Sequence, residues 1–465
     1  MGNYAIVLAA GKGTRMKSRR EDVSKVSFPI LRKPMIEYVL DSLSCLNLDK
    51  IVTVVGFGGE RTSGLASPYG EVVWQNEQKG TGHAVMMAAP ILEKEEGVTI
   101  ICCGDTPLLT DKTLSALVSS HLTNHNALTL LTAIVEDPRG HGRVLEVDGR
   151  VECIIAQKDC TPDIDAIHLI NSGIYVVDNK ELFRHLKRIN PNNPAKEYHL
   201  TDVVSLFVQD GLKVSSFSVA DVNETMSVND RYQLSVAAKI MQRRINKRWM
   251  IHGVTMEDPE TAYVGPDVKL SRDSTIRPNT YIFGKSYVGH DNVIGPGTFL
   301  NNVHIGEGNF ITFCHLEDTT VDDNAVLGPY LRTRQGTHIQ SCAHIGNFNE
   351  LKATDFGYNS ACLHHSYLGN AHIGDNVNIG AGTIIANYDG INISESVIED
   401  RAFIGSGTTL VSPVQVGKEA FVAAGSVINE DVPDKAMAIA RQRQENKEGY
   451  AEKLMDKAIK KRLNK

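Results

Sequence analysis

The sequence predicts two successive folds, an α/β domain and a parallel β-helix, and two periodicities predict them. Up to about residue 228, short apolar runs alternate with amphipathic stretches, a pattern typical of a β-sheet covered by helices on its faces. From residue 264 to 428, apolar residues recur every six positions, a period that amphipathic helices cannot produce. Such a repeat matches one short strand plus a corner, so stacked repeats form a coil with an inward ladder of side chains.

Length and composition restrict the class of protein. The chain of 465 residues is too long for one core, and its composition, 42% hydrophobic and 22% charged, is typical of a globular protein. A net charge of −7 gives no reason to expect nucleic acid or an anionic membrane as a partner. No apolar run approaches the roughly 20 residues that span a bilayer, and Tyr4–Ala10 lacks the basic flank of a signal peptide. The eight cysteines have no paired metal-binding spacing, so reduced thiols in a cytoplasmic protein are expected.

Five short apolar runs in the first part are predicted strands: Tyr4–Ala10, Lys50–Val55, Glu71–Trp74, Val98–Cys103 and Ala127–Val135. Ligands of an α/β sheet bind beyond the carboxyl ends of its strands. Two segments follow such ends directly, Leu8–Met16 and the run Gly-Asp-Thr-Pro that starts at Gly104. We therefore expect a ligand site where these two segments meet.

The segment Leu8–Met16, LAAGKGTRM, is predicted to handle phosphate. Four of its residues have little or no side chain, so a ligand could lie against their backbone: Ala9, Ala10, Gly11 and Gly13. Free backbone N–H groups at such a turn favour negative charge, and Lys12 and Arg15 add two cations. A Walker loop is excluded because Gly13 follows Lys12, and a dinucleotide fingerprint because Met16 occupies the third glycine position. The alternative is an ordinary strand-to-helix turn that needs glycine for its shape.

One long amphipathic helix is predicted from residue 230 to about 252, ended by Gly253. Its apolar residues recur at spacings of three and four: Leu234, Ala238, Met241, Ile245 and Trp249. We interpret it as the connector between the two domains.

The six-residue register runs in three blocks. The first is Val264, Leu270, Ile276, Ile282, Val288, Ile294 and Leu300; the others are Ile373, Ile379, Ile385 and Ile391, and then Ile398, Ile404, Leu410, Val416, Val422 and Ile428. Three hexads per turn predict about nine turns between residues 264 and 428. The tail from Arg441 to Lys465 has nine Lys and Arg against four Asp and Glu, and is predicted to be a solvated helix or a frayed end.

The motifs of both parts, taken in order, resemble one family. In the first part they are LAAGKGTRM, SKV around Lys25, QNEQKGTGHA from Gln75, GDTPL from Gly104, GHGR from Gly140, INSGI from Ile170 and VND at 228–230. In the second part they are AHIGNFNELK from Ala343, IGDNVNIGAGT from Ile373, NYDG from Asn387 and AAGS from Ala423. From Leu8 to Arg441 the chain is similar to the bifunctional N-acetylglucosamine-1-phosphate uridylyltransferase / glucosamine-1-phosphate acetyltransferases.

The resemblance implies the domain boundaries and the reactions. It implies a Rossmann-like nucleotide-diphospho-sugar transferase domain over 1–228, a linker helix over 229–252, a left-handed β-helix acetyltransferase domain over 253–440 and a basic tail over 441–465. The reactions would be acetylation of glucosamine 1-phosphate by acetyl-CoA, and uridylyl transfer from UTP to N-acetylglucosamine 1-phosphate, giving UDP-N-acetylglucosamine and pyrophosphate. The implied enzyme is a cytoplasmic homotrimer that supplies cell-wall synthesis, without nucleic acid or membrane as a partner.

For the first domain, the resemblance assigns catalytic, metal and ligand contacts. Arg15 and Lys25 would neutralise the triphosphate, and Asp105 and Asn229 would contact Mg²⁺, for which carboxylate oxygen is a suitable ligand. This suits nucleotidyl transfer, which depends mostly on positioning and charge neutralisation. The implied nucleotide- and sugar-binding residues are Leu8, Ala9, Ala10, Gly11, Lys25, Gln75, Gly80, Thr81, Cys103, Gly104, Asp105, Gly142, Asn171 and Asn229. Among them Gln75, Gly80 and Thr81 would read the uracil, and Gly142 and Asn171 the sugar.

For the second domain, His364 aligns with the family's general base, and its neighbour His365 is the alternative. Acetyl transfer needs a base to take a proton from the attacking amine, and histidine titrates near working pH. Glucosamine 1-phosphate would contact Arg334, Lys352, Tyr367 and Asn378. Acetyl-CoA would contact Ala381, Asn387, Tyr388, Ser406, Ala424 and Arg441.

Two positions depart from the family. Ala156 stands where the family has a sugar-binding glutamate, and its side chain cannot accept a hydrogen bond from a sugar hydroxyl; Gln157 or a water is the candidate substitute. Ile393 stands where a cation near the acetyltransferase substrate is usual, and the loss of a charge-assisted contact weakens binding in a desolvated site.

Two other functions stay open. The chain could be a uridylyltransferase whose β-helix is a trimerisation scaffold, which Ile393 keeps possible. It could also be a non-catalytic regulatory subunit, and the evidence against this is the presence of Arg15, Lys25, Asp105 and Asn229. Taken singly these residues have structural explanations, since Asp105 could cap a turn and Lys25 could be a solvated charge. Fold alone does not separate these functions.

Overall fold

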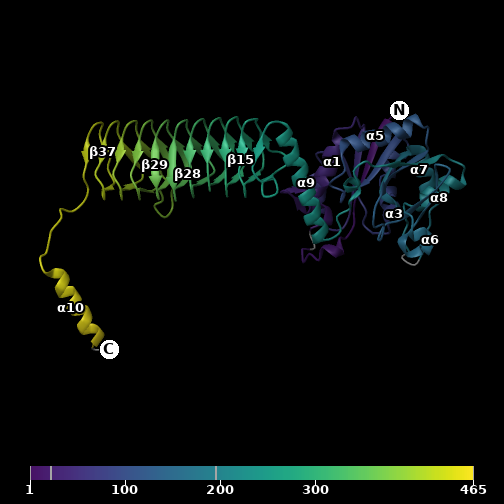
Figure 1. Ribbon diagram of the computed structural model, residues 1–465, viewed down its shortest axis with the longest axis horizontal. Helices are drawn as coiled ribbons and strands as arrows, with labels where there is room; N and C mark the ends of the chain where they lie inside the picture. The colour runs from purple at the N-terminus through teal and green to yellow at the C-terminus, as the bar shows by residue number, and fades with distance from the viewer. Residues whose placement is uncertain (1, 21–22, 194–195, 464–465) are drawn as a thin grey trace. The chain divides into compact units, whose positions relative to one another are not determined.

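The computed structural model describes residues 2–20, 23–193 and 196–463. They form two compact units that meet in sequence at Ile245 and Asn246. The first is an α/β domain and the second is a coil of short strands followed by a C-terminal helix (Figure 1). The predicted fold class is confirmed in both units.

The first unit is built on one sheet with strand order β11-β7-β10-β6-β1-β4-β5. The strands are β1 (Gly2–Ala9), β4 (Lys50–Val55), β5 (Glu71–Trp74), β6 (Gly97–Cys103), β7 (Leu128–Ile134), β10 (Leu169–Asp178) and β11 (Val214–Ser218). All five predicted strands are present, within two residues of the expected bounds. The long strand β10 was not predicted. It runs antiparallel between β6 and β7 and also pairs with the hairpin of β8 (Arg143–Val147) and β9 (Arg150–Ile155).

Helices cover both faces of this sheet because alternate strand residues point to opposite sides. In β1, Ala5 and Val7 face one core and Tyr4 and Ile6 face the other. The first core is closed by α1 (Met35–Ser44), α2 (Gly59–Ala66) and α5 (Asp111–Thr123). The second is closed by α3 (Thr81–Met86), α4 (Ala89–Leu92), α7 (Asn179–Leu186) and α8 (Asp202–Gln209). Short elements join these: strands β2 (Pro29–Ile30) and β3 (Lys33–Pro34), helix α6 (Pro162–Asp165), and 3-10 turns η1 (Thr14–Met16), η2 (Lys25–Ser27), η3 (Gln157–Asp159) and η4 (Val222–Thr225).

The predicted long helix is confirmed as α9 (Arg231–Ile251). Gly253 follows it with φ +92°, a conformation that glycine adopts without the penalty of a Cβ atom. Three residues of the predicted apolar stripe, Leu234, Ala238 and Met241, are partly buried against a core that contains Met35 and Val228. The spacing of apolar residues therefore located the helix correctly.

The second unit is a left-handed parallel β-helix made of two long parallel sheets. One strand per turn forms the 11-stranded sheet: β12 (Thr255–Met256), β15 (Thr275–Ile276), β18 (Val293–Ile294), β21 (Phe310–Ile311), β24 (Val326–Leu327), β27 (His344–Asn347), β29 (Ala361–His364), β31 (Asn378–Ile379), β34 (Phe403–Ile404), β37 (Phe421–Val422) and β39 (Met437–Ala438). Nine of these, β15 to β37, lie between residues 264 and 428, as the period predicted.

The remaining strands of the coil form a 17-stranded sheet: β13 (Tyr263–Val264), β14 (Lys269–Leu270), β16 (Tyr281–Phe283), β17 (Tyr287–Val288), β19 (Phe299–Asn301), β20 (His304–Ile305), β22 (His315–Glu317), β23 (Thr319–Val321), β25 (Arg332–Arg334), β26 (Thr337–Ile339), β28 (Glu350–Phe356), β30 (Tyr367–Ile373), β32 (Ile384–Ala386), β33 (Ser396–Ile398), β35 (Thr409–Val411), β36 (Val414–Val416) and β38 (Val427–Ile428). Each turn stacks on the next in parallel register, as Ile379 on Ile404 and Ile404 on Val422 show.

The predicted inward ladder is buried at every position but one. Ile391 is 87% exposed, so its assignment to the ladder was wrong. It lies in a loop between β32 and β33, where the Asp389 carboxylate accepts hydrogen bonds from the Ile391 and Asn392 backbone N–H groups at 2.8 and 2.6 Å. Turn formation by aspartate therefore overrides the period here, and the register returns at Ile398, which is fully buried.

Two isoleucines of the coil provide a matched test of this ladder. We expect Ile404→Ala to lower the free energy of unfolding by about 2–5 kcal/mol, because its buried side chain leaves a cavity. Ile391→Ala removes the same atoms from an exposed site and is expected to change the free energy of unfolding by less than about 0.5 kcal/mol. Urea denaturation of the full chain, followed by circular dichroism, measures both, and equal effects would contradict the assignment.

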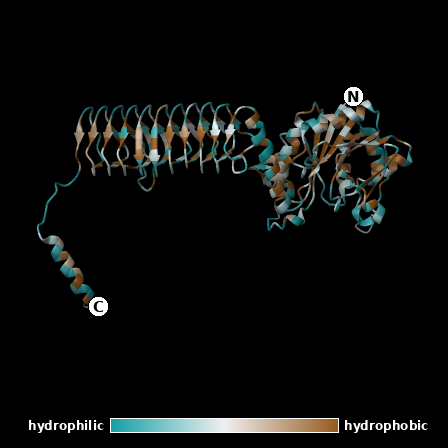
Figure 2. Ribbon diagram, viewed as in Figure 1, coloured by the Kyte–Doolittle hydropathy of each residue, from teal (hydrophilic) through white to brown (hydrophobic). Residues whose placement is uncertain are grey.

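The tail contains helix α10 (Tyr450–Leu463), on which no side chain is buried. Apolar and polar residues alternate along it (Figure 2). A solvated helix was one of the two predicted states. None of the described helices has the length and apolarity that a membrane crossing requires. All eight cysteines are free thiols.

Candidate active sites

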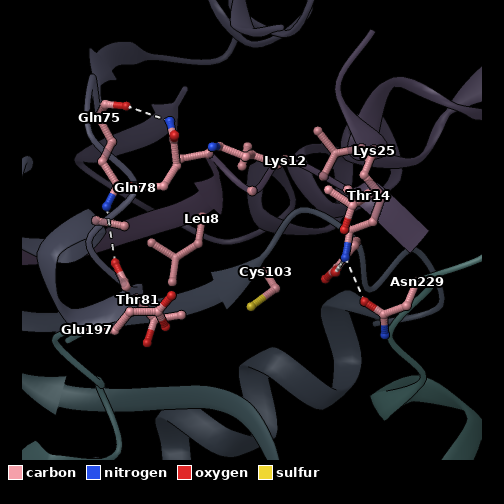
Figure 3. A pocket seen from close by; sticks show the side chains of 18 of the residues that line it. Leu8, Lys12, Thr14, Lys25, Gln75, Gln78, Thr81, Cys103, Glu197 and Asn229 are labelled. Carbon is pink, nitrogen blue, oxygen red and sulfur yellow. Dashed lines mark hydrogen bonds and ion pairs between the residues drawn. The ribbon is translucent and has the colours of Figure 1, made fainter. Parts of the chain in front are cut away.

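A cavity of about 850 Å³ opens at the carboxyl ends of β1 and β6 in the first unit (Figure 3). Its wall contains twelve of the residues predicted to bind nucleotide or sugar or to be catalytic: Leu8, Ala9, Ala10, Gly11, Arg15, Lys25, Gln75, Gly80, Thr81, Cys103, Asp105 and Asn229. The two segments expected to meet at a ligand site therefore do so. The Gly104 N–H donates to the Leu8 carbonyl at 2.9 Å and joins the two strand ends.

The glycine loop can turn tightly because of Gly13. Its φ of +59° is left-handed, and a Cβ atom there would lie 2.7 Å from the Lys25 Cβ. Only glycine lets the loop approach the segment that carries Lys25 so closely. The loop conformation and the position of this lysine are thus linked.

Four predicted residues from distant parts of the sequence converge on one side of the cavity. The Lys25 ammonium forms an ion pair with the Asp105 carboxylate and donates to Asn229 Oδ1 at 2.8 Å. The Arg15 guanidinium donates to the same Asn229 oxygen at 2.8 Å. The Val228 N–H donates to the Asp105 carbonyl at 2.9 Å, which joins the start of α9 to the end of β6. Two cations and two oxygen ligands are thus gathered within hydrogen-bonding distance.

The side-chain oxygens of this cluster are of the chemical kind that Mg²⁺ takes in proteins. Asp105 Oδ1 is buried and has no hydrogen-bond partner among the described residues, and a buried acceptor of this kind requires a partner. Asn229 Oδ1 is a second oxygen of the cluster, and because it accepts from Lys25 and Arg15 in this structure, at least one of these cations would have to turn away from it before it could meet a metal ion. Mg²⁺ is commonly held by one or two carboxylates together with substrate phosphates. No group of three or more His, Cys, Asp or Glu in the described ranges could hold a metal by itself.

The opposite side of the cavity is organised by Gln75. Its side chain is 3% exposed, and its amide nitrogen donates to the Gly80 carbonyl at 3.1 Å and lies 2.9 Å from His83 Nδ1. Burial, together with the charge of Lys79, lowers the pKa of His83. A neutral imidazole accepts the hydrogen bond from the amide, which orients the Gln75 carbonyl oxygen as the group left to meet a ligand.

A loop from residue 197 to 200 closes this side by backbone pairing. The Tyr198 N–H donates to the Lys79 carbonyl and the Gly82 N–H donates to the Tyr198 carbonyl, both at 2.8 Å. The Leu200 N–H donates to the Thr81 hydroxyl at 3.0 Å. Gly80 has φ +103°, and a Cβ atom there would lie 2.5 Å from the Tyr198 carbonyl oxygen. The glycine is thus required for the loop to dock.

In the second unit, the residues predicted to bind glucosamine 1-phosphate lie on neighbouring turns of the coil. Arg334 pairs in register with Lys352, which places two cations on adjacent strands of the 17-stranded sheet. In the same sheet Tyr367 pairs with Glu350. On the 11-stranded sheet Asn378 pairs with Ala361.

His364 is exposed at the end of β29 and pairs in register with Asn347. Its Nδ1 lies 3.3 Å from Asn347 Oδ1. An Nδ1–H that donates to this oxygen leaves Nε2 as the proton acceptor. The alternative, His365, has φ +29°, and its Nε2 would lie 3.3 Å from a Cβ atom on Gly382.

Four predicted acetyl-CoA residues lie along one edge of the coil. The carbonyls of Ala381 and Ser406 accept from the backbone of the following turn at 2.7 and 2.8 Å, and Arg441 Nη1 donates to the Ala424 carbonyl at 2.9 Å. The other two begin the loop that contains Ile391. The Asn387 amide donates to Asn370 Oδ1 at 2.9 Å, and the Tyr388 hydroxyl donates to the Gly390 carbonyl at 2.6 Å.

Comparison with known proteins agrees with this architecture. Residues 5–188 match the MobA-like NTP transferase domain, and residues 371–395 and 396–430 match the hexapeptide repeat of succinyl-transferase. "Bifunctional protein GlmU" of Geobacillus sp. (strain WCH70) is 44% identical over 452 residues, which cover 97% of this chain and 98% of that protein. The protein of the same name from Shouchella clausii (strain KSM-K16) is 42% identical over 453 residues, which cover 97% and 99% of the two chains.

The chain belongs to the bifunctional GlmU family.

Membership of the GlmU family confirms the resemblance seen in the sequence. Both halves of a bifunctional GlmU are present, a nucleotidyltransferase domain and a hexapeptide-repeat acyltransferase domain. The chain is therefore a transferase with two catalytic domains, as predicted.

The GlmU motifs did not reveal the whole cavity wall. Glu197 and His199 also line it, and they follow no motif that marks them as ligand contacts. Only the pairing of their loop with Lys79–Gly82 brings them there. Other lining residues, Asn76, Glu77 and Gln78, belong to the motif that begins at Gln75, although none was singled out.

Three predicted positions lie outside this wall. Gly104 lies behind it, bonded to Leu8. The Asn171 N–H donates to the Gly142 carbonyl at 2.9 Å, so these two residues form a separate pair. The Asn171 side-chain amide donates at 2.9 Å to the Tyr175 hydroxyl.

Proposed function

We propose that the chain acetylates glucosamine 1-phosphate with acetyl-CoA in its β-helix and joins the product to UTP in its α/β domain. The products of the second step are UDP-N-acetylglucosamine and pyrophosphate. The observation that carries this proposal is the convergence of Arg15, Lys25, Asp105 and Asn229 in a cavity large enough for a nucleotide. The domain limits 1–228, 229–252, 253–440 and 441–465, and a cytoplasmic homotrimer, belong to the same proposal.

In the first domain the chain's residues position and neutralise phosphate. A phosphate oxygen of the sugar phosphate attacks the α-phosphorus of UTP, a P–O bond forms, and the bond to the β-phosphate breaks to release pyrophosphate. Arg15 and Lys25 would balance the charge that builds up on the departing phosphates. Asp105 and Asn229 would hold Mg²⁺, which when bound neutralises phosphate charge. Gln75 would read the uracil through its remaining carbonyl oxygen.

In the second domain His364 would accept a proton from the attacking amine of glucosamine 1-phosphate. The amine nitrogen forms a bond to the acetyl carbon, and the thiolate of CoA leaves. Asn347 holds the imidazole with Nε2 free to accept that proton. Arg334 and Lys352, adjacent across two strands, would bind the phosphate. Ile393 is half-exposed and offers no charge, so these two cations would carry phosphate recognition.

Two assays on the purified full chain test the proposal. Pyrophosphate is expected from UTP and N-acetylglucosamine 1-phosphate in the presence of Mg²⁺, and free CoA thiol from acetyl-CoA and glucosamine 1-phosphate. Pyrophosphate without thiol would favour a uridylyltransferase with a scaffolding β-helix. Failure of both would favour a regulatory subunit.

A further inference from the structure

A fully buried arginine lies directly behind the Gly142–Asn171 pair. Arg143 begins β8 and is 0% exposed, while its ion-pair partner Asp165 is half-exposed. One terminal nitrogen of Arg143 donates to the His141 carbonyl. The other donates to Gln157 Oε1 at 2.9 Å and to Asp165 Oδ1 at 3.0 Å. A buried guanidinium requires such partners because an unpaired buried charge is strongly destabilising.

Gln157 joins all parts of this network. Its carbonyl oxygen accepts from Arg143 and, at 3.1 Å, from the Gly140 backbone N–H. Its amide nitrogen donates to Asp165 Oδ1 at 3.0 Å. Three separate segments, Gly140–Arg143, η3 and α6, are therefore fastened by one side chain. We call the residues Arg143, Gln157 and Asp165 the arginine clamp.

The clamp fixes the backbone on which the proposed sugar contacts lie. Gly142 is held between Gly140 and Arg143, both of which bond to Gln157, and its carbonyl accepts from the Asn171 N–H at 2.9 Å. A Cβ atom on Gly142 would lie 3.1 Å from Ile154 Cγ2, so the turn packs closely on β9. Asn171 in turn donates to the Tyr175 hydroxyl at 2.9 Å, and Tyr175 pairs in register with Ile101 of β6, two residues before Cys103 of the cavity wall. The pair is thus linked to the cavity on one side and to the clamp on the other.

We propose that Gln157 is a positioning residue for the sugar phosphate, acting through Arg143 on Gly142 and Asn171. This rests on the proposed uridylyl transfer. Gln157 does not replace the carboxylate missing at Ala156 as a direct contact, because both ends of its amide are already engaged inside the clamp. It holds the contacting backbone in place instead.

The test compares kinetic constants for the two substrates of uridylyl transfer. Gln157→Ala is expected to raise KM for N-acetylglucosamine 1-phosphate at least about tenfold, because Arg143 and the Gly140 N–H lose a shared acceptor, while KM for UTP and the acetyl transfer stay within about twofold. The double variant Gln157→Glu/Asp165→Asn keeps an acceptor at position 157 for Arg143 and the Gly140 N–H and moves the amide donor to position 165, at the loss of the Asp165 oxygen that also accepts from Arg143. It is expected to restore KM to within about threefold of the wild type. Gln209→Ala makes the same substitution at an exposed end of α8 and is the matched control.

Binding of UDP-N-acetylglucosamine and of UTP, measured by calorimetry on the same proteins, gives a readout that does not depend on turnover. If Gln157→Ala lowers the affinity for UDP-N-acetylglucosamine but not for UTP, and the double variant recovers that affinity, the proposed role of the arginine clamp is supported. Equal affinities in the wild type and Gln157→Ala, or parallel loss for both ligands, overturns it. A wild type that binds both ligands but releases no pyrophosphate would overturn the proposed reaction instead, and the binding data would still decide the role of Gln157.

Discussion

Asp105→Asn is expected to reduce uridylyl transfer by about 100- to 1000-fold in kcat while acetyl transfer stays unchanged. Asparagine has nearly the shape of aspartate, so the substitution removes charge and little else. The change takes away the anionic partner of Lys25 and replaces the unpartnered buried oxygen Oδ1, or its neighbour, with an amide nitrogen. Mg²⁺ binding is expected to weaken in parallel, because the ion prefers carboxylate oxygen. Pyrophosphate release as a function of Mg²⁺ concentration measures both effects.

Asp148→Asn is the matched control for this variant. Asp148 is exposed in the turn between β8 and β9 with φ +49°, a conformation that asparagine also accepts. The uridylyl-transfer activity of Asp148→Asn should equal that of the wild type. Full activity of Asp105→Asn at low Mg²⁺ would show that the cluster of Lys25, Asp105 and Asn229 is structural and that the nucleotide is held elsewhere.

His364→Ala is expected to abolish release of CoA thiol, with a loss of at least about 100-fold in kcat, while pyrophosphate formation continues at the wild-type rate. The imidazole is the group placed to accept the proton of the amine, and its Nδ1 is oriented by Asn347. Asn347→Ala should cause a smaller loss, about tenfold, because it removes the orienting acceptor and leaves the base. Thiol titration with each variant measures both.

His365→Ala separates the two adjacent histidines. His365 lies at the corner of the coil, where its Nε2 would be 3.3 Å from a Cβ atom on Gly382 of the next turn. The His365→Ala variant should retain most of the acetyl-transfer activity. If instead His365→Ala is inactive and His364→Ala is active, the base is His365 and the register alignment of His364 with Asn347 has no catalytic meaning.

The local patterns of the sequence predicted most of the fold. Alternation of apolar runs located β1, β4, β5, β6 and β7, and the six-residue period located the ladder of the coil. These patterns predict strands correctly because a strand that buries one face has apolar residues at a regular spacing along the chain. The period misassigned only Ile391, where the hydrogen bonds of Asp389 form a turn that spacing does not register.

Some residues of the candidate sites could likewise be predicted from the sequence, and others could not. Gly13 could be marked from the chemistry of its own loop, whereas Lys25, Gln75 and Asp105 could be marked because they belong to short motifs that resemble those of a known family. Glu197 and His199 could not, because their loop reaches the cavity through backbone hydrogen bonds to a segment more than a hundred residues earlier. Backbone groups are the same in every residue, so the sequence carries little sign of such pairing.

The spacing of residues and the short motifs were thus enough to predict an α/β domain with a glycine-rich loop, a long helix and a hexapeptide coil. The contacts between distant side chains became visible only in the folded chain: the ion pair of Lys25 and Asp105, the closure by residues 197–200, and the arginine clamp around Arg143. The physical reason is the range of the interactions. Periodicity reports the burial of a residue within its own element, whereas a site is made by contacts between elements, whose partners are fixed only when the sheet and the coil are assembled.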